Sequence, residues 1–445
     1  MKTNHKNSWQ SDQRFIDADT KNFSLIFFAF IVGALAGIIA SVFRLTLAYL
    51  DVLREKLYAG AGDSGLISWI LPVLLSVIGI SAALYLVRKF APETSGSGVQ
   101  EIEGALDELR PLRWKRVLPV KFIASLFSLG SGLLLGREGP TIQLGANIGK
   151  MIKDIFKHPD SKTNPLVSAG AAAGLASAFN APFSGIIFVV EEMHGHFKYT
   201  FFSLAAIMVA SGTADFVVRI LVGADPVIKM MVFSPPSLSA SWLFILLGLL
   251  FSLVGYAFNY LLIFSLDFFS DLSKNAVIIS AVIAGVVIAA AGFFYPSMIG
   301  GGYETIRMAL DHSFTLQFLL VLFIGRLLLT IFSYGIGSPG GIFAPLLALG
   351  VVFGMLFGSV MQHFFPELIS HPGVFAVAGM AGIFAATVRA PLTGLMLAVE
   401  MTSNFELLLP LIFTTVTASL VTTQLGNQPI YTTLLKRTLE RAKSG

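Results

Sequence analysis

The stretch Gly136-Arg137-Glu138-Gly139-Pro140 places a guanidinium and a carboxylate inside a long apolar segment. No charged residue occurs from Phe122 to Gly136, and none follows Glu138 until Lys150. A charge at membrane depth costs about 2.5–3.5 kcal/mol on insertion scales, so a residue of this kind indicates function. The glycines and the proline also favour the start of a helix, whose unpaired N–H groups attract anions. We therefore expect Glu138 to occupy a place where a soluble anion could bind, and to carry a proton.

The composition of the chain is that of a membrane protein. Of its 445 residues, 55% are hydrophobic and 13% are charged, and the mean hydropathy is +0.78, which excludes a soluble globular protein. Uncharged stretches long enough to cross a bilayer recur along the sequence. They are Ser24–Phe43, Gly65–Val87, Ser237–Leu266, Asn275–Tyr303, Leu327–Pro366 and Leu407–Leu435. We predict an all-α polytopic membrane protein with many tilted and broken helices.

Basic residues gather at both ends of the chain, whose net charge is +4. The positive-inside rule places such ends in the cytoplasm, so we expect an even number of crossings of a plasma (inner) membrane. About 22 mostly polar residues precede the first apolar stretch, so no signal peptide is expected. The sequence has no cysteine, which excludes disulfides, thiolate metal sites and thiol catalysis. The terminal basic residues are Lys2, Lys6, Arg14, Lys21, Lys436, Arg437, Arg441 and Lys443.

The chain contains an internal repeat. Residues 169–191 match residues 378–400, and residues 127–149 match residues 332–354, so that Lys121 and Arg326 also correspond. We predict two homologous halves of inverted topology, an arrangement that places substrate sites at mid-membrane on the N-termini of broken helices. The expected divisions are a cytoplasmic N-terminal segment 1–21, a first transmembrane repeat 22–225, a linker 226–236, a second transmembrane repeat 237–435 and a short cytoplasmic tail 436–445.

Two further segments have the features of an anion cradle. The repeat places Gly341-Ile342-Phe343-Ala344-Pro345 opposite Gly136–Pro140, with Phe343 opposite Glu138. This second helix start has no charged side chain, so it can offer only N–H groups to a ligand. Gly96-Ser97-Gly98 adds a hydroxyl donor whose flanking glycines leave the backbone open.

These motifs resemble those of the CLC family of chloride channels and chloride/proton antiporters. That family carries Gly-Ser-Gly-Ile-Pro, Gly-Arg-Glu-Gly-Pro and Gly-x-Phe-x-Pro, and a tyrosine near the end of its last helix. Here they correspond to Gly96–Gln100, Gly136–Pro140, Gly341–Pro345 and Tyr431, with Val99-Gln100 in place of Ile-Pro. The resemblance implies the CLC fold and a homodimer with a separate ion path in each subunit. It also implies that chloride is bound by the Ser97 and Tyr431 hydroxyls and the Ile342 and Phe343 N–H groups.

The resemblance further implies that Glu138 is the gating and proton-exchanging glutamate. Glu192 falls where the antiporters of the family keep an internal proton-accepting glutamate and its channels usually carry an apolar residue. We expect Arg137 to act as a structural counter-ion and Glu191 to have a supporting role. The predicted function is therefore secondary active exchange of chloride for protons.

Alternatives remain open at this point. The chain could be a passive chloride channel gated by voltage or pH, or an exchanger of another anion. Enzyme motifs such as Gly-x-Ser-x-Gly, His-Glu-x-x-His and nucleotide-binding fingerprints do not occur, so we expect a membrane transporter and no enzyme. We expect chloride, protons and membrane lipid as partners, and no cofactor, bound metal or nucleic acid.

Overall fold

The computed structural model describes residues 6–63, 69–157, 164–193, 200–311 and 314–444. This described part contains 17 α-helices and no β-strand, which confirms the all-α prediction. The helices of the first half are α1 Lys6–Asp63, α2 Ile70–Phe90, α3 Val99–Leu106, α4 Trp114–Gly130, α5 Glu138–Ile155, α6 Pro165–Phe179, α7 Pro182–Glu192 and α8 Phe201–Leu221. Those of the second half are α9 Ser241–Ser270, α10 Lys274–Phe294, α11 Tyr303–Asp311, α12 Leu316–Gly335, α13 Phe343–Phe364, α14 Gly373–Thr387, α15 Pro391–Thr402 and α16 Leu408–Gln424, followed by α17 Ile430–Ser444.

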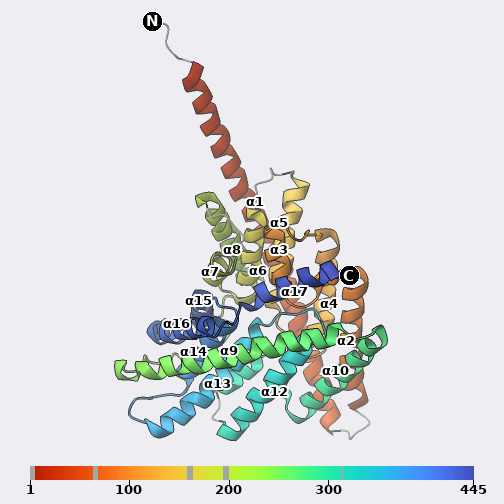
Figure 1. Cartoon of the computed structure of the whole chain (residues 1–445), viewed down its shortest axis with the longest axis vertical. Helices are drawn as coiled ribbons and strands as arrows, with labels where there is room; N and C mark the ends of the chain where they lie inside the picture. Colours follow the sequence, from red (N-terminus) through yellow and green to blue (C-terminus); the bar gives the residue numbers. More distant parts are fainter. Residues whose placement is uncertain (1–5, 64–68, 158–163, 194–199, 312–313, 445) are drawn as a thin grey trace.

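The two halves repeat the same packing. In the first half α5 packs on α6, and α8 packs on both α1 and α6; in the second half α13 packs on α14, and α16 packs on both α9 and α14. The halves contact each other through α2 with α10, α5 with α13 and α7 with α15. In Figure 1, α5–α8 lie in the upper part of the molecule and α9–α14 in the lower part. This is the two-repeat architecture predicted from the sequence.

Glycines at equivalent positions allow the tightest helix crossings. A Cβ atom on Gly145 of α5 would collide with the carbonyl oxygen of Gly170 on α6. In the second half, a Cβ atom on Gly350 of α13 would collide with the carbonyl oxygen of Gly379 on α14. Small residues of this kind let membrane helices approach along their backbones. The conserved spacing of these glycines in the two repeats therefore reflects packing.

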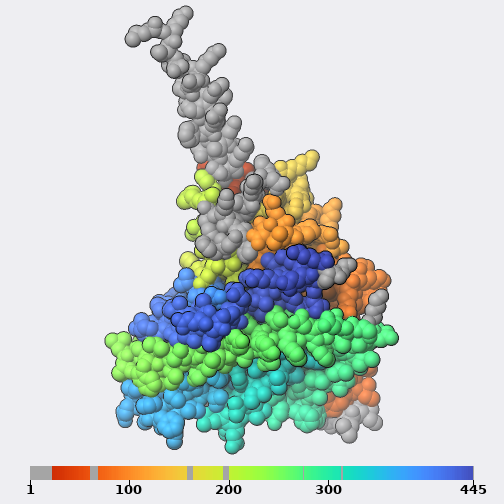
Figure 2. Space-filling view, in the orientation of Figure 1, coloured from red at the N-terminus to blue at the C-terminus, as the bar shows by residue number. Residues whose placement is uncertain are grey.

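Eight of the described helices are long and apolar enough to cross a membrane, while α6 and α14 are shorter apolar helices. The long helix α9 runs across the molecule in Figure 2. It carries exposed apolar side chains at helical spacing, among them Leu249, Leu253, Tyr260 and Phe264. In a bilayer, a helix face of this composition contacts lipid or a second subunit.

Three of the long uncharged stretches are divided by breaks in the helix. Asn275–Tyr303 is interrupted between the end of α10 at Phe294 and the start of α11, and Leu327–Pro366 between α12 and α13. Leu407–Leu435 is interrupted between α16 and α17. Each break contains glycine and proline, which do not continue a helix. Non-helical backbone at membrane depth is tolerated only inside protein or beside a polar cavity, so these breaks indicate where ions could bind.

The linker and the C-terminal tail both pack against the rest of the protein. Residues 226–236 form no helix, but Ile228 and Phe233 are buried and the Ile228 N–H donates to the Met401 carbonyl at 3.1 Å. The expected tail continues α17 through Ser444, and Arg437 pairs with Asp267 at the end of α9 at 2.7 Å. The helix α17, in blue in Figure 1, packs on α3.

Candidate ion-binding site

The starts of α5 and α13 meet in the middle of the molecule. The Gly136 N–H donates to the Gly341 carbonyl and the Gly341 N–H donates to the Gly136 carbonyl, each at 2.7 Å. These two bonds form an isolated antiparallel bridge between the repeats. The glycine-proline helix starts that the repeat relates are therefore paired directly.

Glu138 places its carboxylate on the start of α13. The residue is fully buried, and its Oε2 lies 3.4 Å from the Ala344 backbone nitrogen, which donates to it. Its Oε1 accepts a hydrogen bond from the Tyr303 hydroxyl. Because a helix N-terminus carries partial positive charge, this is a place that suits an anion, and here the anion is a side chain.

The Ser97 and Tyr431 hydroxyls lie next to this helix start. Both residues are fully buried, and Tyr431 is close enough to interact with the Ser97 side chain, yet neither hydroxyl makes a hydrogen bond with another described residue. The Tyr431 ring stacks on the ring of Phe343, with centroids 6.0 Å apart. Buried hydroxyls without partners are uncommon in proteins. Two of them beside a helix N-terminus make a place that a small anion would satisfy.

The backbone at the start of α13 completes this group of donors. The N–H groups of Ile342 and Phe343 make no hydrogen bond with any other described backbone group. Both residues are fully buried. The first turn of a helix leaves such N–H groups without intrahelical partners. The structure thus brings together all four groups that the sequence analysis named as chloride ligands.

A buried lysine fixes the loop that carries Ser97. The Lys121 ammonium donates to the carbonyls of Thr94, Gly96 and Ser97 at 2.9, 2.7 and 3.2 Å. In the second half, Arg326 donates to the carbonyls of Ser297 and Gly300 at 3.0 and 3.1 Å. The two matched cations therefore have the same role. Each donates hydrogen bonds to the backbone carbonyls of a loop, Lys121 to the loop before α3 and Arg326 to the loop before α11.

The turn that carries Val99-Gln100, in place of the Ile-Pro of the family motif, has its own supports. Gly98 has a φ of 87°, a left-handed conformation that favours glycine, and α3 begins at the next residue. The Ser97 N–H donates to the Tyr334 hydroxyl at 3.2 Å. The conformation of this turn is thus stabilised by hydrogen bonds with Lys121 and Tyr334, without a proline at position 100.

Arg137 does not form the ion pair that a counter-ion would make. Its guanidinium donates to the Ala178 carbonyl at 3.1 Å and lies 4.5 Å from the centre of the Tyr303 ring. No ion pair between Arg137 and Glu138 occurs in the described part of the chain. Arg137 therefore acts on Glu138 in two ways. Its positive charge attracts the carboxylate without direct contact, and its guanidinium packs on the ring of Tyr303, which donates to that carboxylate.

Glu191 and Glu192 separate into two different environments at the end of α7. The Glu191 carboxylate accepts from the backbone N–H groups of Leu392 and Thr393 at 3.0 and 2.8 Å, so it caps the start of α15. Glu192 interacts with the neighbouring Glu191, with Arg389 and with Glu103 of α3. Glu103 is fully buried, and neither of its oxygens accepts a bond from a described donor. A single proton held between the two carboxyl groups would satisfy both.

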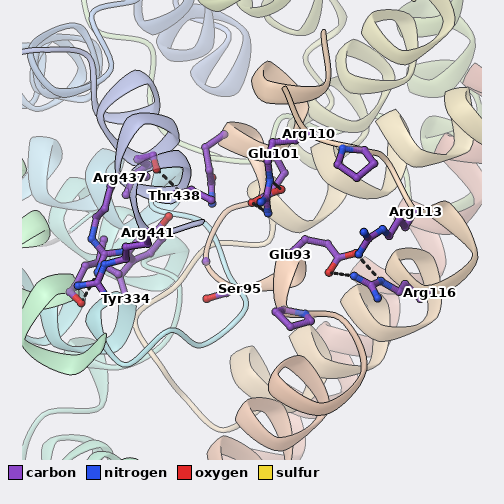
Figure 3. Close-up of a pocket in the computed structure, with 16 residues that line it drawn as sticks. Glu93, Ser95, Glu101, Arg110, Arg113, Arg116, Tyr334, Arg437, Thr438 and Arg441 are labelled. Atoms are coloured by element: carbon purple, nitrogen blue, oxygen red, sulfur yellow. Dashed lines mark hydrogen bonds and ion pairs between the residues drawn. The ribbon is translucent and has the colours of Figure 1, made fainter. Parts of the chain in front are cut away.

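Two cavities lie beside residues of the site. One, of about 420 Å³, is lined by Arg44, Gly136, Arg137 and Tyr303 among others. The other, of about 460 Å³, includes Ser95 and Gly96 beside Ser97 and is drawn in Figure 3. Its wall carries five arginines, of which Arg110 pairs with Glu101 at 2.9 Å and Arg116 with Glu93 at 2.6 Å. Arg437 and Arg441 also pair with a carboxylate, that of Asp267, at 2.7 and 3.4 Å, so most of the positive charge on this wall is compensated. The five are Arg110, Arg113, Arg116, Arg437 and Arg441.

Sequence reasoning missed three residues of this site. Tyr303 and Tyr334 supply hydroxyl groups to Glu138 and Ser97, and Glu103 faces Glu192. Tyr303 follows three consecutive glycines, Gly300–Gly302, and this stretch corresponds across the repeat to the glycines around Ser97. That correspondence indicates that the loop before Tyr303 also lies at the site. The sequence around Tyr334, in the apolar helix α12, contains no pattern that predicts a role at the site.

The chain has close relatives among characterised transporters. It is 44% identical over 434 residues to the H(+)/Cl(-) exchange transporter ClcA of Vibrio parahaemolyticus, covering 97% of this chain and 93% of the relative. The corresponding protein of Salmonella paratyphi A is 41% identical over 434 residues, with 96% and 92% covered. A crystal structure of a slow cyanobacterial Cl-/H+ antiporter matches with a TM-score of 0.91 and 37% identity, covering 94% of this chain and 98% of that one.

A more distant structure shares the fold alone. A eukaryotic CLC transporter superposes with a TM-score of 0.78 at 21% identity, over 92% of this chain and 73% of the other. The model of the voltage-gated chloride channel family matches residues 79–423, which include both helix starts and Ser97. With this match, the relatives and the paired helix starts, the chain belongs to the CLC family of voltage-gated chloride channel proteins.

Proposed function

We propose that this protein is a secondary active transporter that exchanges chloride for protons across the membrane. The observation that carries the proposal is the position of the Glu138 carboxylate on the Ala344 N–H, at the start of α13 and beside Ser97 and Tyr431. One side chain there can compete with chloride for the same donors and can also bind a proton. The relatives named as H(+)/Cl(-) exchange transporters support the same reaction.

Chloride binding would use hydroxyl and N–H donors without a fixed cation. The donors are the Ser97 and Tyr431 hydroxyls and the N–H groups of Ile342 and Phe343. Such a set replaces part of the hydration shell of chloride, and it binds weakly enough to permit release. Lys121 supports the loop through its carbonyls and leaves the hydroxyl of Ser97 available to the anion.

Exchange follows from the competition between the two anions. When chloride enters from the side of the arginine-lined cavity, it displaces the Glu138 carboxylate from the N-terminus of α13. The displaced side chain moves toward the cavity that Arg137 and Tyr303 line, where it takes up a proton. When the protonated side chain returns and releases its proton to the other side, chloride leaves in the opposite direction.

Protons need a second route on the cytoplasmic side, and we assign its entry to Glu192. Its carboxyl interacts with the buried carboxyl of Glu103, and neither residue lines the arginine-rich cavity that chloride would use. A carboxyl pair of this kind can receive and release a proton. It favours exchange over a passive channel, which has no need of a buried proton acceptor.

The remaining parts of the proposal concern assembly and location. We infer a homodimer with one ion path in each subunit, located in the plasma membrane of a bacterium with both termini in the cytoplasm. The exposed apolar face of α9 and the basic residues of α17 are compatible with this arrangement.

Proteoliposomes with an imposed chloride gradient test the proposal. We expect the gradient to drive protons uphill, with chloride moving in the opposite direction. Chloride flux without proton movement would indicate a passive channel, and transport of neither ion would direct attention to other anions.

A further inference from the structure

We propose that Tyr303 is a positioning residue that holds the Glu138 carboxylate on the anion site and so sets how strongly it competes with chloride. The inference rests on the proposed role of Glu138 as gate. The Tyr303 hydroxyl donates to Oε1 of Glu138, while Oε2 faces the Ala344 N–H. Both carboxylate oxygens are therefore held by the second repeat, one by a side chain of α11 and one by the backbone of α13.

The tyrosine ring is fixed from two directions. The Arg137 guanidinium lies 4.5 Å from the ring centroid, and it is itself held by the Ala178 carbonyl. The backbone before Tyr303 is anchored because Arg326 donates to the Gly300 carbonyl at 3.1 Å. A cation over an aromatic face stabilises the ring position. The hydroxyl is thus presented to Glu138 in a defined orientation.

The two repeats place equivalent loops beside the start of α5, and only the second carries a hydroxyl at the first residue of its helix. Gly302 precedes α11 with a φ of 109°, as Gly98 precedes α3, so Tyr303 corresponds to Val99. The first repeat places Ser97 against Gly139, where an added Cβ would lie 2.5 Å from the Ser97 Oγ. The second repeat places Tyr303 on the carboxylate of Glu138. Both equivalent loops thus contact the start of α5, one at Gly139 and the other at Glu138.

The position of Tyr303 gives it control over the departure of Glu138. Tyr303 and Arg137 line the cavity of about 420 Å³ toward which we propose that the carboxylate moves. To leave the anion site, the Glu138 carboxylate must break its hydrogen bond with the Ala344 N–H. It can keep the bond with the Tyr303 hydroxyl or break that bond as well. The charged group that acts on this carboxylate is Arg137, and Arg44 of α1, which donates to Asn180 at 2.6 Å, lies near Arg137 and Tyr303. Removing the Tyr303 hydroxyl leaves the Arg137 bond to the Ala178 carbonyl and the Arg44 bond to Asn180 with their partners present.

Chloride binding to the purified full-length protein at neutral pH tests this inference by calorimetry. Tyr303→Phe keeps the ring under Arg137 and removes only the hydroxyl. We expect it to raise the chloride affinity about tenfold, the effect of losing one hydrogen bond to a charged group that competes with the ligand. Tyr295→Phe, at the exposed end of α10, is the matched control and should leave the affinity unchanged.

The same substitution in a Glu138→Ala background separates the possible outcomes. There Tyr303→Phe should have no effect, because the competing carboxylate is absent. An equal effect in both backgrounds, or no effect in the wild-type background, would overturn the role of Tyr303. If Glu138→Ala alone left both chloride affinity and proton coupling intact, the proposed function would fail independently of Tyr303.

Discussion

Glu191 of the first repeat and Glu400 of the second each cap a helix of the other repeat. Glu191 accepts from the Leu392 and Thr393 N–H groups at 3.0 and 2.8 Å, at the start of α15. Glu400 accepts from the Phe183 and Ser184 N–H groups at 3.1 and 2.7 Å, at the start of α7. The two carboxylates thus tie the repeats together by the same interaction in both directions.

Loss of one of these caps should destabilise the fold. Glu191→Ala removes three hydrogen bonds to a carboxylate, including one from the Thr393 hydroxyl at 2.8 Å, and leaves their donors unpaired. We expect a loss of about 2–4 kcal/mol, seen as a lower melting temperature in detergent. Glu304→Ala breaks only the exposed pair with Arg307 and serves as the control, with an expected loss below about 1 kcal/mol. Equal melting temperatures would contradict the capping role.

Lys121 should be needed for chloride binding although it does not face the anion. Lys121→Met leaves the carbonyls of Thr94, Gly96 and Ser97 without a donor, so the Ser97 loop can relax. We expect chloride affinity to fall at least about tenfold, because each bond to a buried charge is worth about 1.5–3 kcal/mol. Calorimetry measures this directly. Lys115→Met, at an exposed position of the same helix, should bind chloride normally; a normal affinity in Lys121→Met would refute the argument.

Glu192 should be needed for protons more than for chloride. Glu192→Gln keeps the size of the side chain but removes its ability to accept a proton, while the donors at Ser97 and Tyr431 are untouched. Flux measurements in proteoliposomes should show proton transport reduced at least about a hundredfold, the lower end of the usual effect of a proton-transfer group. Chloride movement should persist. Glu108→Gln, an exposed carboxylate beyond α3, provides the control. A proportional loss of both fluxes would assign Glu192 a structural role instead.

Much of this architecture could be predicted because its signals are local or repeated. The apolar stretches indicate the membrane helices, and the glycine-proline motifs at 136–140 and 341–345 indicate the two helix starts that the structure pairs. The repeat also matched Lys121 with Arg326. Their role could not be predicted, because their partners are backbone carbonyls whose direction depends on the folded loops.

The partners of Glu138 and Glu192 depend on contacts that no local pattern contains. Tyr303 lies 165 positions from Glu138 along the chain, and it reaches the carboxylate only because the repeats are inverted about the site. Glu103 reaches Glu192 from a different helix, α3. Arg137 was expected to be a structural counter-ion; its charge acts on Glu138, while its guanidinium donates to the Ala178 carbonyl, a partner that the sequence does not indicate.

Parallel recording of chloride and proton fluxes in Glu138→Ala proteoliposomes tests the central claim most directly. If Glu138 is the point at which the two ions exchange, chloride should still cross and an imposed chloride gradient should no longer move protons. Proton transport that continued in this variant, coupled to chloride as in the wild type, would contradict the account.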